Sequence, residues 1–455
     1  MKHRVTGLAA RAVGFALAAL VMLPGGASSE PRRAQSTHAF LESIGVVSTF
    51  PDRGQPLAKT IEMVRYGGFR WVRAGIEGLT EKGPTTIQTF LDLHRETGVR
   101  LSWGLVSGGT DIPKLIETGK VLADAGALLA IEGNNEPNNW GVFYDGERGG
   151  GNAPSWMAVA KLQRDLYKAV KSDPVLARYP VWSISAAGAQ RDNVGLQFLK
   201  IPPGANTLMP DGTAYADYAN VHNYIYHRRS PHPRDNQVWN ASDITAVSKV
   251  DGLFGNFGVT WSRGFHGYRQ EQLDTLPRVT TETGTVIGGE VTEQLHGLHL
   301  MNLYLAQFKQ GFAYTSVYLL RDRTDERGNQ TFGFFAPDYA PRKAALYLHN
   351  LTSVLQDKQA LAAPGQLDYE IMEQPETVHD LLLQRSDGTF QLVIWGERLA
   401  GEDLMTVRFG QTHPSVTIYN PTIGTDPVAE VAGVKALYLA LSDHPLIVSI
   451  PPPAK

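Results

Sequence analysis

The sequence predicts an α/β chain in which a (β/α)8 barrel of the TIM type is followed by a small all-β, sandwich-like domain. Two observations lead to this prediction. Strand-like apolar runs alternate with helix-like segments throughout residues 38–358, and only strand-like segments and turns follow in residues 360–455. A chain of 455 residues is long enough for one large and one small domain. A TIM barrel takes ~200 to 400 residues of such a chain.

The barrel prediction rests on eight alternating elements. Eight apolar segments have the length of strands, and they are 43–47, 69–76, 100–106, 128–134, 181–187, 218–224, 278–282 and 314–320. Helical segments are expected at 57–66, 86–97, 112–125, 159–170, 194–199, 271–276, 293–308 and 342–355. An open doubly wound sheet would alternate in the same way. It usually carries a glycine-rich phosphate turn after its first strand, and Ser-Thr-Phe-Pro at 48–51 is not one.

The sequence pattern of the C-terminal region is typical of an all-β domain. Short strands are expected at 369–372, 380–384, 390–394, 406–409, 416–419 and 436–441. Turn residues such as Ser386-Asp387-Gly388 separate some of them. These segments predict a sandwich packed against the flank of the barrel.

Residues 1–29 have the order of a secretory signal peptide. Basic residues at Lys2, Arg4 and Arg11 precede an apolar run at 12–23, and small residues follow at 25–29. A membrane anchor is the alternative, but a run of roughly a dozen residues is short against the ~20 that span a bilayer. The sequence therefore predicts a secreted or periplasmic protein with no stable membrane insertion after cleavage.

Composition excludes several classes of function. The formal net charge is −3 and no dense basic stripe is present, which argues against nucleic acid as the partner. The chain has no cysteine, which excludes cysteine nucleophiles, thiolate metal sites and disulfides. His222 and His227 lie close in sequence, but no second His/Asp cluster completes a metal site. We expect no metal and no cofactor, and the oligomeric state stays open.

Chemistry in a TIM barrel takes place at the carboxyl ends of the strands. Glu136 follows the fourth predicted strand and Glu282 ends the seventh, so two carboxylates are expected to face each other across the barrel mouth. Glycoside cleavage needs such a pair, one to protonate the leaving oxygen and one to stabilise or attack the anomeric carbon. Reading the other strand ends in order adds Arg73, Trp103, Asn135, His222, Tyr224 and Arg321 as candidate site residues.

The segment 130–138 (Ala-Ile-Glu-Gly-Asn-Asn-Glu-Pro-Asn) resembles the fourth-strand motif of clan A retaining glycoside hydrolases, and 279–284 (Val-Thr-Thr-Glu-Thr-Gly) resembles their seventh strand. The residues from Gly333 to Ala344 are similar to the end of barrels that a β-sandwich follows, as in families 39, 51 and 79, with family 39 the nearest. The resemblance implies that Glu136 is the general acid/base and Glu282 the nucleophile.

The same resemblance implies roles for the neighbouring residues. Arg73 would keep Glu282 ionised, Tyr224 would donate a hydrogen bond to it, and Asn135 would bind the sugar 2-hydroxyl. His222 would also line the sugar subsite. Many clan members end strand eight with a tryptophan that stacks on the sugar, and here Tyr318-Leu319-Leu320-Arg321 occupies that stretch. Stacking is therefore assigned to Tyr318 or to a tryptophan, with Trp103, Trp140 and Trp239 as the candidates.

Two physical expectations accompany these roles. Partial burial and the charge of Glu282 should raise the pKa of Glu136 so that it is protonated as an acid. Glu132, four residues earlier, is expected to be a buried partner of a basic residue such as Arg73.

The long connection at 228–275 and the insertion at 144–151 are expected to build walls around a cleft, which favours an oligo- or polysaccharide over a disaccharide. The leading interpretation is a retaining β-glycosidase that acts on an extracellular or cell-envelope polysaccharide. A transglycosylase with the same intermediate remains an alternative. A carbohydrate-binding barrel without catalysis is the other.

Overall fold

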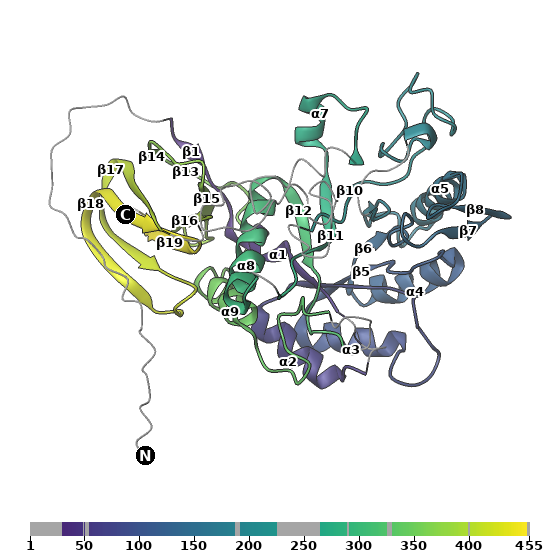
Figure 1. Cartoon of the computed structure of the whole chain (residues 1–455), viewed down its shortest axis with the longest axis horizontal. Helices are drawn as coiled ribbons and strands as arrows, with labels where there is room; N and C mark the ends of the chain where they lie inside the picture. Colours follow the sequence, from purple (N-terminus) through teal and green to yellow (C-terminus); the bar gives the residue numbers. More distant parts are fainter. Residues whose placement is uncertain are drawn as a thin grey trace, which may run out of the picture.

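The computed structural model describes residues 30–48, 50, 54–186, 192–224, 264–288, 291–324, 330–398 and 401–452. The predicted signal peptide 1–29, Trp239 and most of the 228–275 connection lie outside these residues. A barrel and a separate β-sheet domain lie side by side (Figure 1). Within the described ranges, no helix has both the length and the apolar character needed to cross a membrane.

Eight parallel strands form the barrel, as predicted. In sheet order they are β10 (Ala219–Asn220), β11 (Arg278–Thr283), β12 (Phe312–Val317), β3 (Ile44–Val47), β4 (Trp71–Ala74), β5 (Arg100–Trp103), β6 (Leu128–Glu132) and β9 (Val181–Trp182). Single parallel bridges, Trp182 to Tyr218 and Ala186 to Val221, link the two ends of this order and close the ring.

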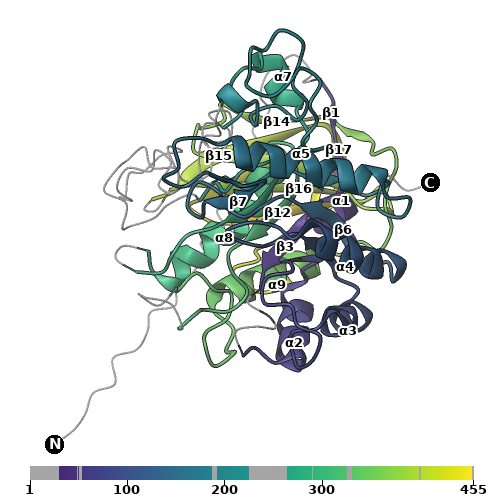
Figure 2. The same cartoon turned by 90° about the vertical axis from the view of Figure 1, so that its right-hand side faces the viewer.

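Helices surround the strands (Figure 2). They are α1 (Thr37–Glu42), α2 (Leu57–Gly67), α3 (Ile87–Thr97), α4 (Ile112–Asp124), α5 (Met157–Ser172), α7 (Gln270–Thr275), α8 (Glu293–Lys309) and α9 (Lys343–Val354). The helix predicted at 194–199 is wrong, because only the short 3-10 turn η1 (Asp192–Val194) forms there. Gly195 has a φ of 83°, a left-handed conformation that ends a helix.

Side chains fill the barrel in layers, as two-residue alternation along a strand requires. One layer is aromatic: Trp71 meets Trp182 edge-on with ring centroids 5.4 Å apart. Gly45 leaves room for it, since a Cβ at that position would lie 2.1 Å from the Trp71 ring. The next layer is polar and buried. Arg73 lies two residues after Trp71 on β4, and Glu132 lies two residues after Ala130 on β6. The polar side chains of the site therefore pack directly on a layer of aromatic side chains inside the barrel.

The C-terminal domain is a curled antiparallel sheet with an apolar core of its own. Its strands are β13 (Gln366–Leu367), β14 (Tyr369–Met372), β15 (Val378–Gln384), β16 (Phe390–Gly396), β17 (Asp403–Tyr419), β18 (Pro427–Leu441) and β19 (Pro445–Ile450). The two strands predicted at 406–409 and 416–419 are parts of the single long β17, and β19 was not predicted. Two strands that precede the barrel, β1 (Arg32–Arg33) and β2 (Gln35–Ser36), pair with β13 and β15.

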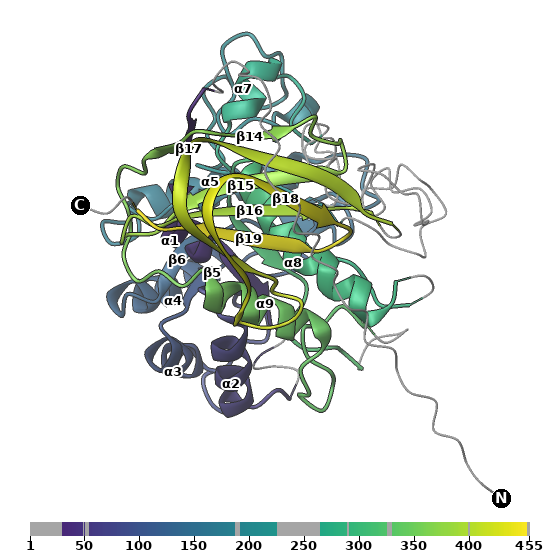
Figure 3. The same ribbon diagram turned by 90° about the vertical axis from the view of Figure 1, so that its left-hand side faces the viewer.

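This domain packs against the flank of the barrel that α8 and α9 form (Figure 3). Lys309 Nζ of α8 lies 3.2 Å from Asp380 Oδ1 of β15, and Asn302 Nδ2 donates to the Asp443 carbonyl at 3.1 Å. Most of α8 is buried all round, which explains why its sequence carries no polar face. The carboxyl ends of the strands stay clear of this contact.

Candidate active site

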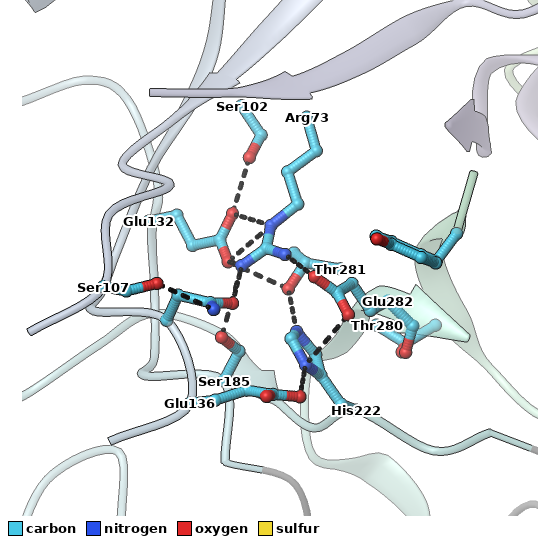
Figure 4. A network of polar contacts seen from close by, with 12 residues as sticks. Arg73, Ser102, Ser107, Glu132, Glu136, Ser185, His222, Thr280, Thr281 and Glu282 are labelled. Carbon is cyan, nitrogen blue, oxygen red and sulfur yellow. Dashed lines mark hydrogen bonds and ion pairs between the residues drawn. The ribbon is translucent and has the colours of Figure 1, made fainter. Parts of the chain in front are cut away.

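The strand ends bring Glu136 and Glu282 together. One oxygen of each carboxylate and one nitrogen of His222 all lie within 4.8 Å of one another. Figure 4 shows His222 between the two acids and Arg73 on the other side of Glu282. Carboxylates that act by double displacement at a sugar lie ~5 to 5.5 Å apart, so this separation suits a directly attacking nucleophile.

Glu282 is held by two donors. Arg73 Nη1 donates to its Oε1 at 2.6 Å, and the Tyr224 hydroxyl donates to its Oε2 at 2.8 Å. Burial and the charge of Glu282 raise the pKa of Tyr224 well above its ordinary value, so that hydroxyl keeps its proton. Two donors therefore fix the orientation of the Glu282 carboxylate.

Arg73 is fully buried and donates to four side chains, those of Glu282, Glu132, Asn135 and Ser185. Its Nε and Nη2 donate to Glu132 at 3.0 and 2.6 Å, and Nη2 also donates to Asn135 Oδ1 at 2.9 Å. Burial alone would lower the pKa of Arg73, but Glu132 and Glu282 raise it above the ordinary value. The prediction that Glu132 is a buried partner of Arg73 is confirmed.

Glu136 sits on strained backbone. Its φ of 38° is unusual for a residue with a side chain, and such conformations persist only where the surroundings hold them. Here its N–H donates to the Ser185 carbonyl at 3.0 Å, and its own carbonyl accepts from the N–H groups of Asn139 and Trp140, both at 2.8 Å. This geometry aims the carboxylate at His222 Nδ1, which lies 2.7 Å from Oε1, while Asn139 Nδ2 donates to Oε2 at 2.8 Å.

The predicted direction of the Glu136 pKa is wrong. Burial raises this pKa, as expected, but the hydrogen bond and charge of His222 lower it, with help from Asn139 and Arg73, and the pKa falls below its ordinary value. From the sequence, the negative charge of Glu282 was expected to have the largest effect on the pKa of Glu136. In the folded chain the nearest ionisable atom is His222 Nδ1, an electropositive partner.

Solved structures share this architecture. A family 39 glycoside hydrolase from the gut symbiont Bacteroides cellulosilyticus WH2 superposes with a TM-score of 0.57 at 15% identity, covering 91% of this chain and 82% of the other. A 4-O-alpha-L-rhamnosyl-beta-D-glucuronidase from Fusarium oxysporum 12S gives 0.55 at 13% identity, covering 94% and 99%. An alpha-L-arabinofuranosidase from Thermotoga maritima gives 0.56 at 8% identity, covering 93% and 98%.

This chain has the fold of these glycoside hydrolases. The fold that the resemblance implied, a barrel followed by a β domain, is thus confirmed. No protein-family model and no curated protein sequence matches the chain.

The two aromatic candidates Tyr318 and Trp140 lie on segments next to the acids, and the Trp140 backbone N–H donates to the Glu136 carbonyl. Tyr318 lies edge-on to Tyr224 with centroids 6.5 Å apart, and its hydroxyl bonds to Gln330 and to Arg323 Nη1. Trp140 is 56% exposed in the loop that follows Glu136. Trp140 is therefore accessible to a ligand, whereas Tyr318 packs against Tyr224 and Phe332.

Two predicted binding residues are placed elsewhere. Trp103 is fully buried in the main core, edge-on to Phe90, and its Nε1 donates to Thr118 Oγ1 at 2.9 Å, so the prediction that it stacks on substrate is wrong. It is inaccessible because its side chain points outward from β5 to the helix layer. Arg321 is directed at the segment before α9, where Nη1 donates to the Pro337 carbonyl at 3.2 Å and its guanidinium covers Tyr339.

Sequence reasoning missed several polar residues of the network. They are Ser102, Ser107, Asn139, Ser185 and Thr281. Thr281 offered a signal, because it directly precedes Glu282 on β11, and its hydroxyl contacts Glu132 inside the barrel. The serines offered no signal, because a single serine on a strand is as often a structural residue as a site residue.

The spacing of Glu136, His222 and Glu282 would also suit a metal ion. Each of the four carboxylate oxygens, however, already has a hydrogen-bond partner, namely Arg73, Tyr224, His222 or Asn139. The guanidinium of Arg73 also places a fixed positive charge 2.6 Å from Glu282. This donor set suits two carboxylates that exchange protons better than it suits a cation.

Proposed function

We propose that this protein is a retaining glycoside hydrolase that works by double displacement through a glycosyl-enzyme intermediate. The proposal rests on two carboxylates that have an oxygen each within 4.8 Å of one another and that have different hydrogen-bond partners. Glu282 is bound by a guanidinium and a hydroxyl, whereas Glu136 faces an imidazole nitrogen that can share a proton with it. Environments that separate the two acids in this way are what this chemistry requires.

The first step breaks the glycosidic bond. Glu282 attacks the anomeric carbon, and Glu136, with the proton it shares with His222, protonates the leaving oxygen. The charge of Glu282 is then lost, so Arg73 and Tyr224 no longer face a carboxylate there. In the second step a water gives its proton back to Glu136, its oxygen bonds to the anomeric carbon, and Glu282 leaves as a carboxylate.

The substrate is proposed to be an extracellular or cell-envelope oligo- or polysaccharide with β-glycosidic bonds. The signal-like sequence of residues 1–29 supports export, and the resemblance to clan A supports the linkage. Two exposed aromatic side chains, Trp140 at 56% and Phe143 at 62%, follow Glu136 in sequence and support contacts beyond the cleaved sugar. Asn135, whose Oδ1 is fixed by Arg73, is proposed to bind the 2-hydroxyl.

Purified protein incubated with a panel of aryl glycosides and polysaccharides tests the activity. For any substrate that is cleaved, proton NMR of the first product identifies its anomeric configuration before mutarotation. We expect the configuration of the substrate to be retained. An inverted first product would rule out the double displacement, and binding of saccharides without cleavage would leave a non-catalytic barrel.

The Glu136→Ala variant tests the acid separately. It should lose about 10²- to 10⁴-fold in kcat/KM on substrates with poor leaving groups, because those need protonation. Activated aryl glycosides, whose leaving groups depart as anions, should lose far less in the first step. Measuring kcat/KM across a leaving-group series checks this. An equal loss across the whole series would contradict an acid role for Glu136.

A further inference from the structure

Four side chains form a hydrogen-bonded line that begins at the buried Glu132 and ends at Glu136 (Figure 4). Glu132 Oε1 lies 2.9 Å from Thr281 Oγ1, and Thr281 Oγ1 lies 3.1 Å from His222 Nε2. On the other side of the ring, His222 Nδ1 lies 2.7 Å from Glu136 Oε1. Thr281 and His222 are almost fully buried, so water does not complete these contacts for them.

Each of these three gaps has hydrogen-bond length and therefore requires one proton. An ionised carboxylate supplies none, a threonine hydroxyl supplies one, and a neutral imidazole supplies one. Two ionised carboxylates with a neutral His222 would leave one gap without a proton. The line therefore holds one additional proton.

Asn220 decides where that proton lies. Its Oδ1 accepts from the Thr281 backbone N–H at 3.2 Å, and its Nδ2 donates to the Ser183 carbonyl at 3.2 Å and to Thr281 Oγ1 at 3.0 Å. The Thr281 hydroxyl has two acceptors within reach, Asn220 Oδ1 at 3.2 Å and Glu132 Oε1 at 2.9 Å. It donates to Glu132, because that contact is shorter and a bond to a carboxylate is stronger than one to an amide oxygen. Its remaining lone pair accepts from His222 Nε2. The additional proton accordingly lies between His222 Nδ1 and Glu136.

We propose that Glu132 and Thr281 are positioning residues that keep His222 protonated at Nε2, so that the His222–Glu136 pair stores the proton consumed when the glycosidic bond breaks. This inference rests on the proposed function. When the bond between the anomeric carbon and the leaving oxygen breaks, Glu282 bonds to that carbon and the stored proton goes to the leaving oxygen. The pair then holds a neutral imidazole and an ionised Glu136, and the water of the second step reloads it.

The charges around His222 favour the loaded pair. The ionisable groups that face it from the surrounding strands and loops are Glu136, Glu282, Glu132 through Thr281, Arg73 and Tyr224. Three of these are acids, one is a permanent cation and one is a phenol, so acidic groups outnumber cations around the His222–Glu136 pair. This arrangement also reconciles the lowered pKa of Glu136 with an acid role, because the proton is stored 2.7 Å away on the ring.

The wild-type protein provides the first test. Long-range 15N–1H NMR of histidine-labelled protein reports which ring nitrogens carry protons, and it needs no glycoside. We expect His222 Nε2 to be protonated throughout the pH range of activity. A His222 with a bare Nε2 and a proton only on Nδ1 in that range would overturn the proposal, whether or not the protein cleaves any sugar.

The matched pair Thr281→Val and Thr281→Ser provides the second test. Valine removes the acceptor for His222 Nε2–H, so the neutral imidazole can adopt the other tautomer, with its proton on Nδ1. That proton then bonds to Glu136 without an additional one, and the His222–Glu136 pair binds the stored proton less tightly. The basic limb of the kcat/KM profile should move to lower pH by about one unit in Thr281→Val. Thr281→Ser, which keeps the hydroxyl, should overlay the wild type.

Circular dichroism establishes that both variants are folded. A basic limb that stays in place in a folded Thr281→Val would contradict the proposal, as would a Thr281→Ser profile displaced as far as that of valine. If Thr281→Val does not fold, the wild-type NMR decides. A wild type that cleaves no glycoside would refute the proposed function, and the NMR result would still decide the location of the proton.

Discussion

Replacing Glu282 with glycine is expected to lower kcat/KM on an activated aryl glycoside by about 10³-fold or more, because it removes the carboxylate proposed to attack the anomeric carbon. Glu282 is the carboxylate that Arg73 and Tyr224 hold at 2.6 and 2.8 Å, so the variant leaves both donors facing an empty space the size of a small anion. Added azide or formate should enter that space, attack the sugar and restore turnover. The product with azide should be a glycosyl azide of the opposite anomeric configuration.

The control for this experiment is Glu132→Gln, a second acid bound to the same guanidinium but lying deeper in the barrel. Azide should not rescue any loss in that variant, since the fault there is not a missing nucleophile. The measurement is the steady-state rate with and without azide, together with the anomeric signal of the product. Normal turnover by Glu282→Gly would remove Glu282 from its proposed role.

The second large effect concerns stability. Arg73→Met should lower the free energy of unfolding by about 3–5 kcal/mol, because it strands a buried carboxylate without its cation. Glu132 and Arg73 side chains are both 0% exposed and lie 2.6 Å apart, so no water replaces the lost partner. Urea unfolding followed by circular dichroism measures the change.

Two variants calibrate this result. In the Arg73→Met/Glu132→Gln double variant the charge that was stranded is also removed, so part of the lost stability should return. Lys59→Met breaks the surface pair with Glu62, whose side chains are 44% and 62% exposed, and should cost no more than about 1 kcal/mol. An Arg73→Met variant as stable as Lys59→Met would show that the buried ion pair does not stabilise the barrel.

Much of the barrel was predictable because each element follows from local periodicity. The helix at 159–170 buries the face that its apolar residues define, and the structure extends it only to Met157–Ser172. The helix at 194–199 failed because Gly195 adopts a left-handed conformation that periodicity does not register. The strands β1 and β2 escaped prediction because their partners lie more than 300 residues away in sequence.

The candidate site divides in the same way. Strand order alone placed Glu136 and Glu282 at the barrel mouth, since parallel strands all end at one face. Trp103 shows the limit of that reasoning: a residue at a strand end points either inward or outward, and Trp103 points into the helix layer. A one-residue difference in alternation separates a binding residue from a core residue.

The sequence by itself determined which residue types were available and in what order, and therefore the barrel, the β domain and the two acids that meet at its mouth. Only the tertiary structure decided which charges surround each acid. Electrostatic effects depend on distances of a few ångströms, and His222 Nδ1 at 2.7 Å reverses the shift that Glu282 was expected to impose on Glu136. Distances of this kind are set by packing among strands far apart in the chain, which no local pattern records.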